Sequence, residues 1–252
     1  MKHGRISEPS REVPVFGDYE VVVLGGGPAG IAAALAAGRC GRSTILIERY
    51  GFLGGAGTAA GLSTFCGLHA VVHGEHKQVV HGIADDILNR LRAMHGLNQP
   101  HLTVQNKIQA QAYDISAFKI AADELMSAAK VKVLFHAFAA GAMMAADDRV
   151  EALIVETKSG RYAILGRIFI DGSGDGDLAA WAGAPFEVGD GAGNTLYPST
   201  MFRINGVDPQ KAGQAWDLIP ALMETAFSMA ADSMRRLPLT ETSAIRSPSA
   251  RT

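Results

Sequence analysis

The sequence predicts an α/β fold in which helices cover a largely parallel sheet, and three observations support this fold class. An apolar run at 21–24 leads into the pattern Gly25-x-Gly27-x-x-Gly30, which an alanine-rich stretch follows. A second apolar run, at 43–47, ends at Glu48, 18 residues after Gly30. A third, at 168–170, leads into another turn rich in glycine and aspartate. Short strands that are apolar on both faces and alternate with helices are typical of parallel sheets.

The first of these turns has the composition of a dinucleotide-binding site. Gly25 makes the tight turn, Gly27 lets the backbone approach a pyrophosphate, and Gly30 lets the helix pack closely on the strand. The N-terminus of the following helix offers unpaired N–H groups to an anion, and Glu48 is placed to accept hydrogen bonds from the adenosine ribose. The predicted contacts from this turn are Gly25, Gly26, Gly27, Pro28, Ala29 and Gly30.

Two other interpretations of this region are weaker. A plain surface turn does not require a strand, a helix and a distal acid in the same register. Residues 21–38 are uncharged for long enough to cross a bilayer, but glycines and Pro28 interrupt the stretch where a spanning helix would break.

The residues after the second strand favour FAD over other dinucleotides. Glu48 argues against NADP, because its carboxylate would repel the 2′-phosphate, although Arg49 lies beside it. Gly54 and Gly55 would let a second backbone segment close on the pyrophosphate, a contact that NAD needs less. We therefore predict Arg49, Gly54, Gly55 and Thr58 as further cofactor contacts.

The run E-R-Y-G-F-L-G-G at 48–55 resembles the hallmark E-R-x-G-x-L-G-G of FAD-dependent oxidoreductases with a glutathione-reductase-type fold, in the subgroup akin to fumarate-reductase flavoproteins. The run D-G-S-G-D-G-D at 171–177 is similar to the A-T-G-D-G-D run of that family, with Gly172 and Ser173 replacing alanine and threonine. The resemblance covers about residues 19–204. It implies a Rossmann-type FAD-binding domain with a three-layer β-β-α architecture and a β-meander crossover, in which Gly174 and Asp175 lie near the FAD.

The second turn also invites a different interpretation. Its aspartates and Ser173 match the first positions of a calcium-binding loop, but Ala182 stands where a bidentate glutamate is required. A solvated acidic loop is the other alternative.

The pattern along the chain predicts the domain organisation. Residues 1–17 form a polar arm, 18–188 the FAD-binding domain with a flavin-side insertion at 57–115, 189–236 the start of a substrate domain, and 237–252 a disordered tail. Within these, we expect helices at 82–94, 116–129 and 208–235, the last interrupted by Pro220. Further strands are expected at 131–135 and 199–204, and a hairpin joins 150–156 to 161–165 through Gly160.

Composition excludes several classes of protein. A formal charge of −2 removes the electrostatic case for nucleic acid, and no membrane span is expected. The N-terminus lacks an apolar leader, which predicts a cytoplasmic protein. Two cysteines 26 positions apart, Cys40 and Cys66, exclude a CxxC dithiol.

The segment 57–81 should lie beside the flavin, and it concentrates one cysteine and several histidines: Cys66, His69, His73, His76 and His81. Acid–base or substrate contact, a metal site and ordinary structural histidines all remain open for them. We predict no metal site and assign no catalytic residue, either here or at Arg203.

The sequence thus predicts an enzyme that oxidises or reduces a small organic substrate by hydride transfer to or from N5 of FAD. The resembled family continues well past this length and returns to the FAD domain with a further strand. One alternative is therefore a C-terminally truncated flavoprotein that is non-catalytic alone or needs another chain, and the expected partners are a small-molecule substrate and a second chain or a homo-oligomer. Another is an NAD-dependent Rossmann dehydrogenase.

Overall fold

The computed structural model describes residues 9–103, 108–145, 148–196, 198–201, 206 and 208 of the 252. The chain forms two compact units, residues 1–203 and 204–252. All helices and strands described below lie in the first unit.

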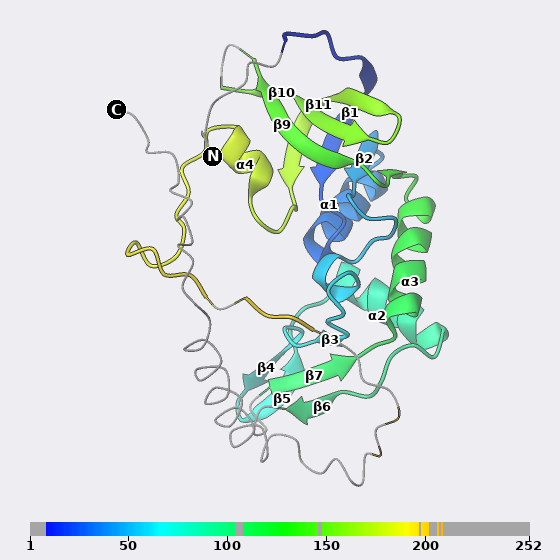
Figure 1. The fold of residues 1–252 in the computed structure, drawn as a ribbon. Coiled ribbons are helices and arrows are strands. Elements are labelled where there is room, and N and C mark those ends of the chain that lie inside the picture. Colours follow the sequence, from blue (N-terminus) through cyan, green and yellow to red (C-terminus); the bar gives the residue numbers. More distant parts are fainter. Residues whose placement is uncertain are drawn as a thin grey trace. The chain divides into compact units, whose positions relative to one another are not determined.

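A six-stranded sheet with the order β8-β2-β1-β11-β10-β9 forms the centre of this unit (Figure 1). The first four strands in that order are parallel, whereas β10 is antiparallel to both of its neighbours. Their bounds are β1 Val15–Leu24, β2 Thr44–Ile47, β8 Lys132–Leu134, β9 Phe138–Met144, β10 Val150–Thr157 and β11 Gly160–Asp171. This arrangement confirms the predicted α/β class.

Strand β11 joins the β-meander to the parallel strands. We predicted two strands here, at 161–165 and 168–170, but one strand of 12 residues covers both. Its first half pairs with β10, while residues 163–171 run beside β1, from Val15 opposite Ala163 to Leu24 opposite Asp171. Strand β1 begins at Val15, six residues before the apolar run at 21–24.

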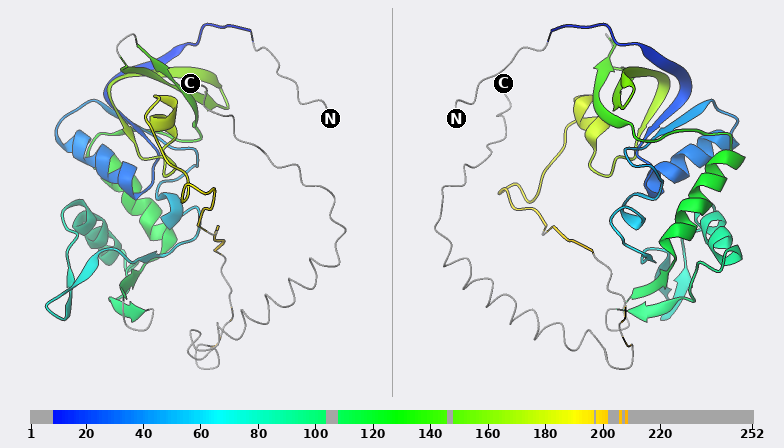
Figure 2. Two further views of the ribbon diagram at one scale, coloured as in Figure 1. Left: turned by 90° about the vertical axis from the view of Figure 1, so that its left-hand side faces the viewer. Right: turned by 45° about the vertical axis from the view of Figure 1, so that its right-hand side comes forward.

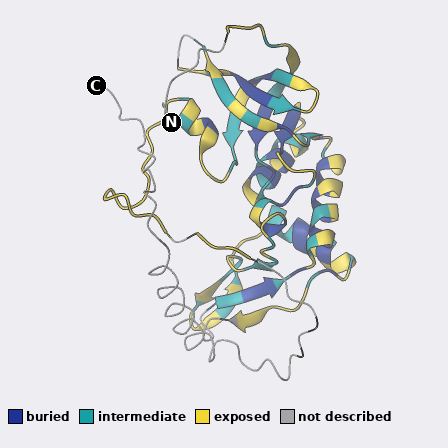
Figure 3. Cartoon of the chain, viewed as in Figure 1, coloured by how far each residue is buried: buried dark blue, intermediate teal, exposed yellow. Residues whose placement is uncertain are grey.

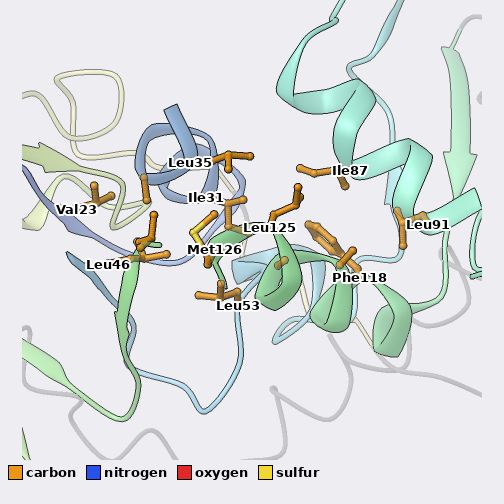
Figure 4. Close-up of a cluster of buried hydrophobic side chains, with 14 of the residues drawn as sticks. Val23, Ile31, Leu35, Leu46, Leu53, Ile87, Leu91, Phe118, Leu125 and Met126 are labelled. Atoms are coloured by element: carbon orange, nitrogen blue, oxygen red, sulfur yellow. The ribbon is translucent and has the colours of Figure 1, made fainter. Parts of the chain in front are cut away.

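One face of the sheet is covered by helices. Helices α1 Pro28–Arg39 and α3 Ile115–Ala128 contact the strands, and α2 Ile83–Ala93 packs against these two helices. Figure 4 shows Val23 and Leu46 of the sheet beside Ile31 and Leu35 of α1 and Met126 of α3. Helix α3, predicted at 116–129, buries these side chains: Phe118, Ala121, Ala122, Leu125 and Met126. In Figure 3 these inner helix faces are dark blue and the outer faces yellow.

The opposite face of the parallel strands is covered by the meander. Val22 and Ile45 pack there with Leu153 of β10 and Ile164 of β11 in a second buried cluster. The hydrogen-bonded sheet therefore curls over its own second face, so that helices, parallel strands and meander form the three predicted layers (Figure 2).

The insertion at 57–115 carries α2 and two small sheets. Strands β3 Thr64–Phe65, β7 Ile108–Ala112 and β6 His101–Thr103 form one sheet, and β4 His69–Val72 and β5 Glu75–Gln78 form a hairpin. Tyr113 connects parts of this segment with one another and contacts Phe118 of α3, with ring centroids 5.2 Å apart. Its hydroxyl lies 2.9 Å from the carbonyl oxygen of Gly57 and 2.7 Å from that of Leu62, and its ring stacks on Phe65 with centroids 4.3 Å apart.

Two predictions fall wholly or largely outside the described residues. Of the strand expected at 199–204, residues 199–201 are described and adopt no regular structure. The helix expected at 208–235 and the tail at 237–252 lie outside the described residues, apart from Asp208. Within the described part of the chain, no helix is both long enough and apolar enough to span a bilayer.

Candidate cofactor site

A cavity of about 950 Å³ opens where β1, β2 and β11 end. This is the edge at which α/β sheets bind ligands, because the loops there diverge to helices on one side and to the meander on the other. The lining residues come from five segments, within 24–29, 47–50, 55–60, 137–139 and 171–181. Most of the cofactor contacts predicted from sequence are among them, namely Gly25, Gly26, Gly27, Pro28, Ala29, Glu48, Arg49, Gly55, Gly174 and Asp175.

The floor of the cavity is a close crossing of two backbone segments. The Gly172 N–H donates to the Leu24 carbonyl oxygen at 2.8 Å. A Cβ on Gly25, which has a φ of +93°, would lie 2.3 Å from the Gly172 oxygen. A Cβ on Gly30 would lie 1.8 Å from the Gly25 oxygen. Glycine is therefore required at both positions by contacts within the protein, and Gly30 itself does not line the cavity.

Gly27 differs from these two glycines. It is the N-cap of α1, with an extended backbone that any residue adopts, and Pro28 begins the helix. A Cβ on Gly27 would meet nothing closer than the Gly55 Cα at 3.9 Å. Because first-turn N–H groups have no partner within a helix, those of Ala29 and Gly30 remain available to an anion. The bare Cα and these donors suit a pyrophosphate.

Glu48 is buried beside this turn, with 5% of its surface exposed. Its Oε2 accepts a hydrogen bond from the Gly26 N–H at 2.7 Å, and its Oε1 accepts one from the Tyr50 N–H at 2.8 Å. An ionised carboxylate has about four acceptor positions, so two remain for hydroxyl groups of a ligand. Glu48 thus fixes the geometry of its own loop and keeps the capacity to bind a ribose.

The loop after β2 is fastened to the glycine turn. The Gly54 N–H donates to the Gly26 carbonyl oxygen at 2.8 Å, and a Cβ on Gly55 would lie 2.8 Å from the Gly27 Cα. Thr58 Oγ1 donates to the Leu53 carbonyl oxygen at 2.8 Å, and Thr58 is buried. Neither Gly54 nor Thr58 lines the cavity. The structure therefore places both as supports of the loop.

The turn after β11 is organised by Asp171. Its Oδ1 accepts hydrogen bonds from the N–H and the hydroxyl of Ser173, at 3.0 and 2.6 Å, and its Oδ2 accepts one from the Ala179 N–H at 2.9 Å. Partial burial alone would raise the pKa of Asp171, but these hydrogen bonds and one from the Leu178 backbone lower it below its ordinary value. The bonds shape the turn so that Gly174 and Asp175 lie along the cavity.

The structure does not assemble a metal centre from the predicted histidines. Cys66, His69 and His73 do not share a helix, because His69 begins strand β4 and His73 lies in the turn that joins β4 to β5. Burial, together with the charge of nearby His76, lowers the pKa of His69. Within the described residues, no three His, Cys, Asp or Glu side chains converge to hold a metal ion, and none of Cys66, His69, His73, His76 and His81 lines the cavity.

Several lining residues were not predicted from the sequence. Ala137, Phe138 and Ala139 approach from the start of β9, and the Ala137 N–H donates to the Glu48 carbonyl oxygen at 3.1 Å. Trp181 approaches from α4, Asp177–Trp181. These residues belong to no motif, so only the folded chain brings them to the cavity.

Comparison with known proteins gives partial matches. A curated relative, dihydrolipoyl dehydrogenase of Trypanosoma brucei brucei, is 50% identical over 42 residues, which are 17% of this chain and 9% of that protein. Among solved structures, THI4 of Thermovibrio ammonificans matches with 15% identity and a TM-score of 0.46, over 65% of this chain and 61% of THI4. The open conformation of a flavocytochrome c3 fumarate reductase matches with 17% identity and a TM-score of 0.44, over 62% of this chain and 34% of that one.

This chain therefore spans less than two thirds of each of these relatives. The family model described as FAD dependent oxidoreductase matches residues 20–248, which is most of the chain. The chain belongs to the FAD-dependent oxidoreductase family, and its cofactor is FAD.

Proposed function

We propose that the cavity at the ends of β1, β2 and β11 holds FAD, and that the protein exchanges a hydride with a small organic substrate. The observation that carries the proposal is the contrast among the glycines. A Cβ on Gly25 or Gly30 would collide with backbone atoms of the protein. The Cα of Gly27, in contrast, faces the cavity at a helix N-terminus. A bound FAD supplies the centre that accepts or donates the hydride.

In this proposal each side of the cavity has a task. The N–H groups at the start of α1 bind the pyrophosphate, and Gly27 lets it approach them. Glu48 accepts hydrogen bonds from the ribose, and the loop at 54–58 closes over the glycine turn. The alanines at 56, 59 and 60 continue the lining beyond the pyrophosphate, on the side where the insertion begins. These residues bind and orient the cofactor, and no acid or base is assigned.

We also propose the subgroup akin to fumarate-reductase flavoproteins, on the strength of the run E-R-Y-G-F-L-G-G at 48–55. The structure gives this run a physical reason. The second segment, through Gly54 and Gly55, is bonded to the first through Gly26 and approaches Gly27. Such a double backbone enclosure suits a cofactor that stays bound more than the NAD of a dehydrogenase, which must leave after each turnover.

Reconstitution with FAD tests the proposal. The purified protein should carry, or take up, about one equivalent of FAD, with the visible absorption of a bound flavin, and should release it on unfolding. NADH serves as the competing ligand. A folded sample that binds NADH tightly and takes up no FAD would contradict the proposal and support an NAD-dependent dehydrogenase.

A further inference from the structure

We propose that Phe138 and Trp181 hold the adenine ring of the cofactor, one ring from β9 and the other from α4. The inference rests on the proposed binding of FAD in this cavity and adds the part of the site that recognises the base. Neither residue belongs to the glycine turns or to the acid that identify a dinucleotide site from sequence.

The order of groups along the cavity places the adenine. The pyrophosphate lies at the start of α1, and the adenosine ribose lies at Glu48. The base must therefore lie beyond Glu48, on the side away from the helix. The residue hydrogen-bonded to Glu48 on that side is Ala137, whose N–H donates to the Glu48 carbonyl oxygen at 3.1 Å. Phe138 follows it directly and lines the cavity, as does Trp181.

Both rings are available for stacking. Phe138 is 59% exposed and Trp181 is 36% exposed, so neither side chain is buried by other protein atoms. Among the residues that the structure describes, neither ring pairs with another aromatic ring or with a cation. A purine offers a flat π face that aromatic side chains bind with little dependence on its identity.

The neighbouring contacts hold the two rings in place. Phe138 begins β9, where it pairs with Glu156 of β10, so its backbone is fixed by the meander. Trp181 ends α4, a helix that follows the turn organised by Asp171 and is bonded to it through the Ala179 N–H. Phe138 and Trp181, which we call the aromatic wall of the cavity, therefore come from two elements outside the glycine turn.

Binding of ADP tests the inference without the flavin. ADP carries the adenine, ribose and phosphates but no isoalloxazine, so it reports on this half of the site alone. Trp181→Leu and Phe138→Leu should each weaken the binding of ADP and of FAD by a similar factor, about five- to 150-fold, the usual range for loss of one base–aromatic stack. Trp181→Phe should retain most of the affinity. Phe186→Leu is the matched control, because Phe186 is 70% exposed and does not line the cavity.

Tryptophan fluorescence gives a second measurement, which would not change if Trp181 only supported the fold. The chain has two tryptophans, so a Trp216→Phe background leaves Trp181 as the only one. ADP does not absorb where tryptophan emits, and a change in Trp181 emission on saturation with ADP therefore reports direct stacking. We expect quenching by ADP and none by inorganic pyrophosphate.

The outcomes separate this inference from the proposed function. If the wild type binds FAD and ADP but both leucine variants bind them with unchanged affinity, the aromatic wall is wrong and the FAD site stands. Saturation with ADP without any change in Trp181 emission would overturn the role of Trp181 in the same way. A folded wild type that binds neither ligand would overturn both proposals.

Discussion

At the scale of a single residue, a substitution of Gly27 should weaken cofactor binding without affecting folding. Its φ is −72° and its ψ is −179°, so an L-residue fits the backbone, and a Cβ there has no protein atom within 3.9 Å. We expect Gly27→Val to fold with nearly the wild-type thermal midpoint and to bind FAD at least about tenfold more weakly, a loss of about 1.4 kcal/mol or more. Flavin titration and thermal unfolding of the same samples measure both quantities.

Gly30→Ala is the matched control for that experiment. Its methyl group would lie 1.8 Å from the Gly25 oxygen, so the strand and the helix must separate. This variant should lose stability as well as binding. Wild-type FAD affinity in folded Gly27→Val would show that the cofactor binds elsewhere.

Glu48 combines two roles that a substitution will reveal together. Glu48→Ala removes the acceptor of the Gly26 and Tyr50 N–H groups and the proposed acceptor of the ribose hydroxyls. We expect FAD binding to weaken by about 1.5–3 kcal/mol, the usual scale for hydrogen bonds to a charged group. Isothermal titration with FAD provides the measurement. Glu151→Ala, an exposed residue of β10, should leave the affinity unchanged.

Some residues of the cavity could be predicted from the sequence, and others could not. The glycine turn and Glu48 could be predicted because each position has one backbone requirement that few residues meet. Thr58, a predicted contact, donates its hydroxyl hydrogen to the Leu53 carbonyl oxygen and does not line the cavity. Phe138 and Trp181 carry no local requirement. Their place at the cavity depends on how the meander and α4 pack, and no pattern along the chain records that.

At the scale of elements, Tyr113 connects the 57–62 loop and Phe65 of β3 with Phe118 of α3. Burial raises its pKa to about 12 from 10.0, with a smaller contribution from nearby Cys66. Tyr113→Phe keeps the ring contacts with Phe65 and Phe118 but removes the hydroxyl that bonds to the 57–62 loop. We expect the free energy of unfolding to fall by about 0.5–1.5 kcal/mol at neutral pH, the usual value of one hydrogen bond. Urea unfolding would measure it.

The same tyrosine predicts a pH dependence. A phenol whose pKa is higher in the folded state than in the unfolded state stabilises the fold fully below the unfolded value. This contribution is lost as the pH rises from about 10 to about 12. The difference in stability between wild type and Tyr113→Phe should therefore shrink over that interval. Tyr162→Phe, which removes an exposed hydroxyl, is the control and should change the free energy of unfolding little. A constant difference between wild type and Tyr113→Phe up to pH 12 would contradict the assignment.

Two elements escaped prediction for reasons that lie in tertiary structure. Strand β11 was divided because Gly166 and Arg167 interrupt its apolar pattern. Gly166 is buried against Val22, where a Cβ would lie 2.6 Å from the Val22 Cγ2, so packing requires the glycine. The β4–β5 hairpin was missed because its turn is His73-Gly74. Both residues have positive φ, a geometry more often signalled by asparagine and glycine.

At the scale of the whole molecule, cofactor binding should stabilise the fold. FAD at about 100 times its dissociation constant adds about 2.7 kcal/mol if it binds only the folded state. For a chain of this size, that corresponds to a rise in the thermal midpoint of about 5–10 °C. Differential scanning fluorimetry with a non-flavin dye provides the test. Gly27→Val should show little or no rise, and an equal rise in both proteins would indicate nonspecific binding.

The pairing of Leu24 with Asp171 determines at which point of synthesis the chain becomes able to bind FAD. The glycine turn, α1 and Glu48 leave the ribosome early, yet the floor of their cavity is the backbone around Gly172. That segment pairs with β1 across about 150 residues of intervening chain, and parallel pairing over such a separation forms slowly. The glycine turn and Glu48 are therefore synthesised well before β11, and they cannot form the complete site until β11 has paired with β1. FAD can accordingly bind only after the sheet has formed. A nascent chain that ends before Gly160 would contain the glycine turn but would lack the backbone around Gly172 on which it packs.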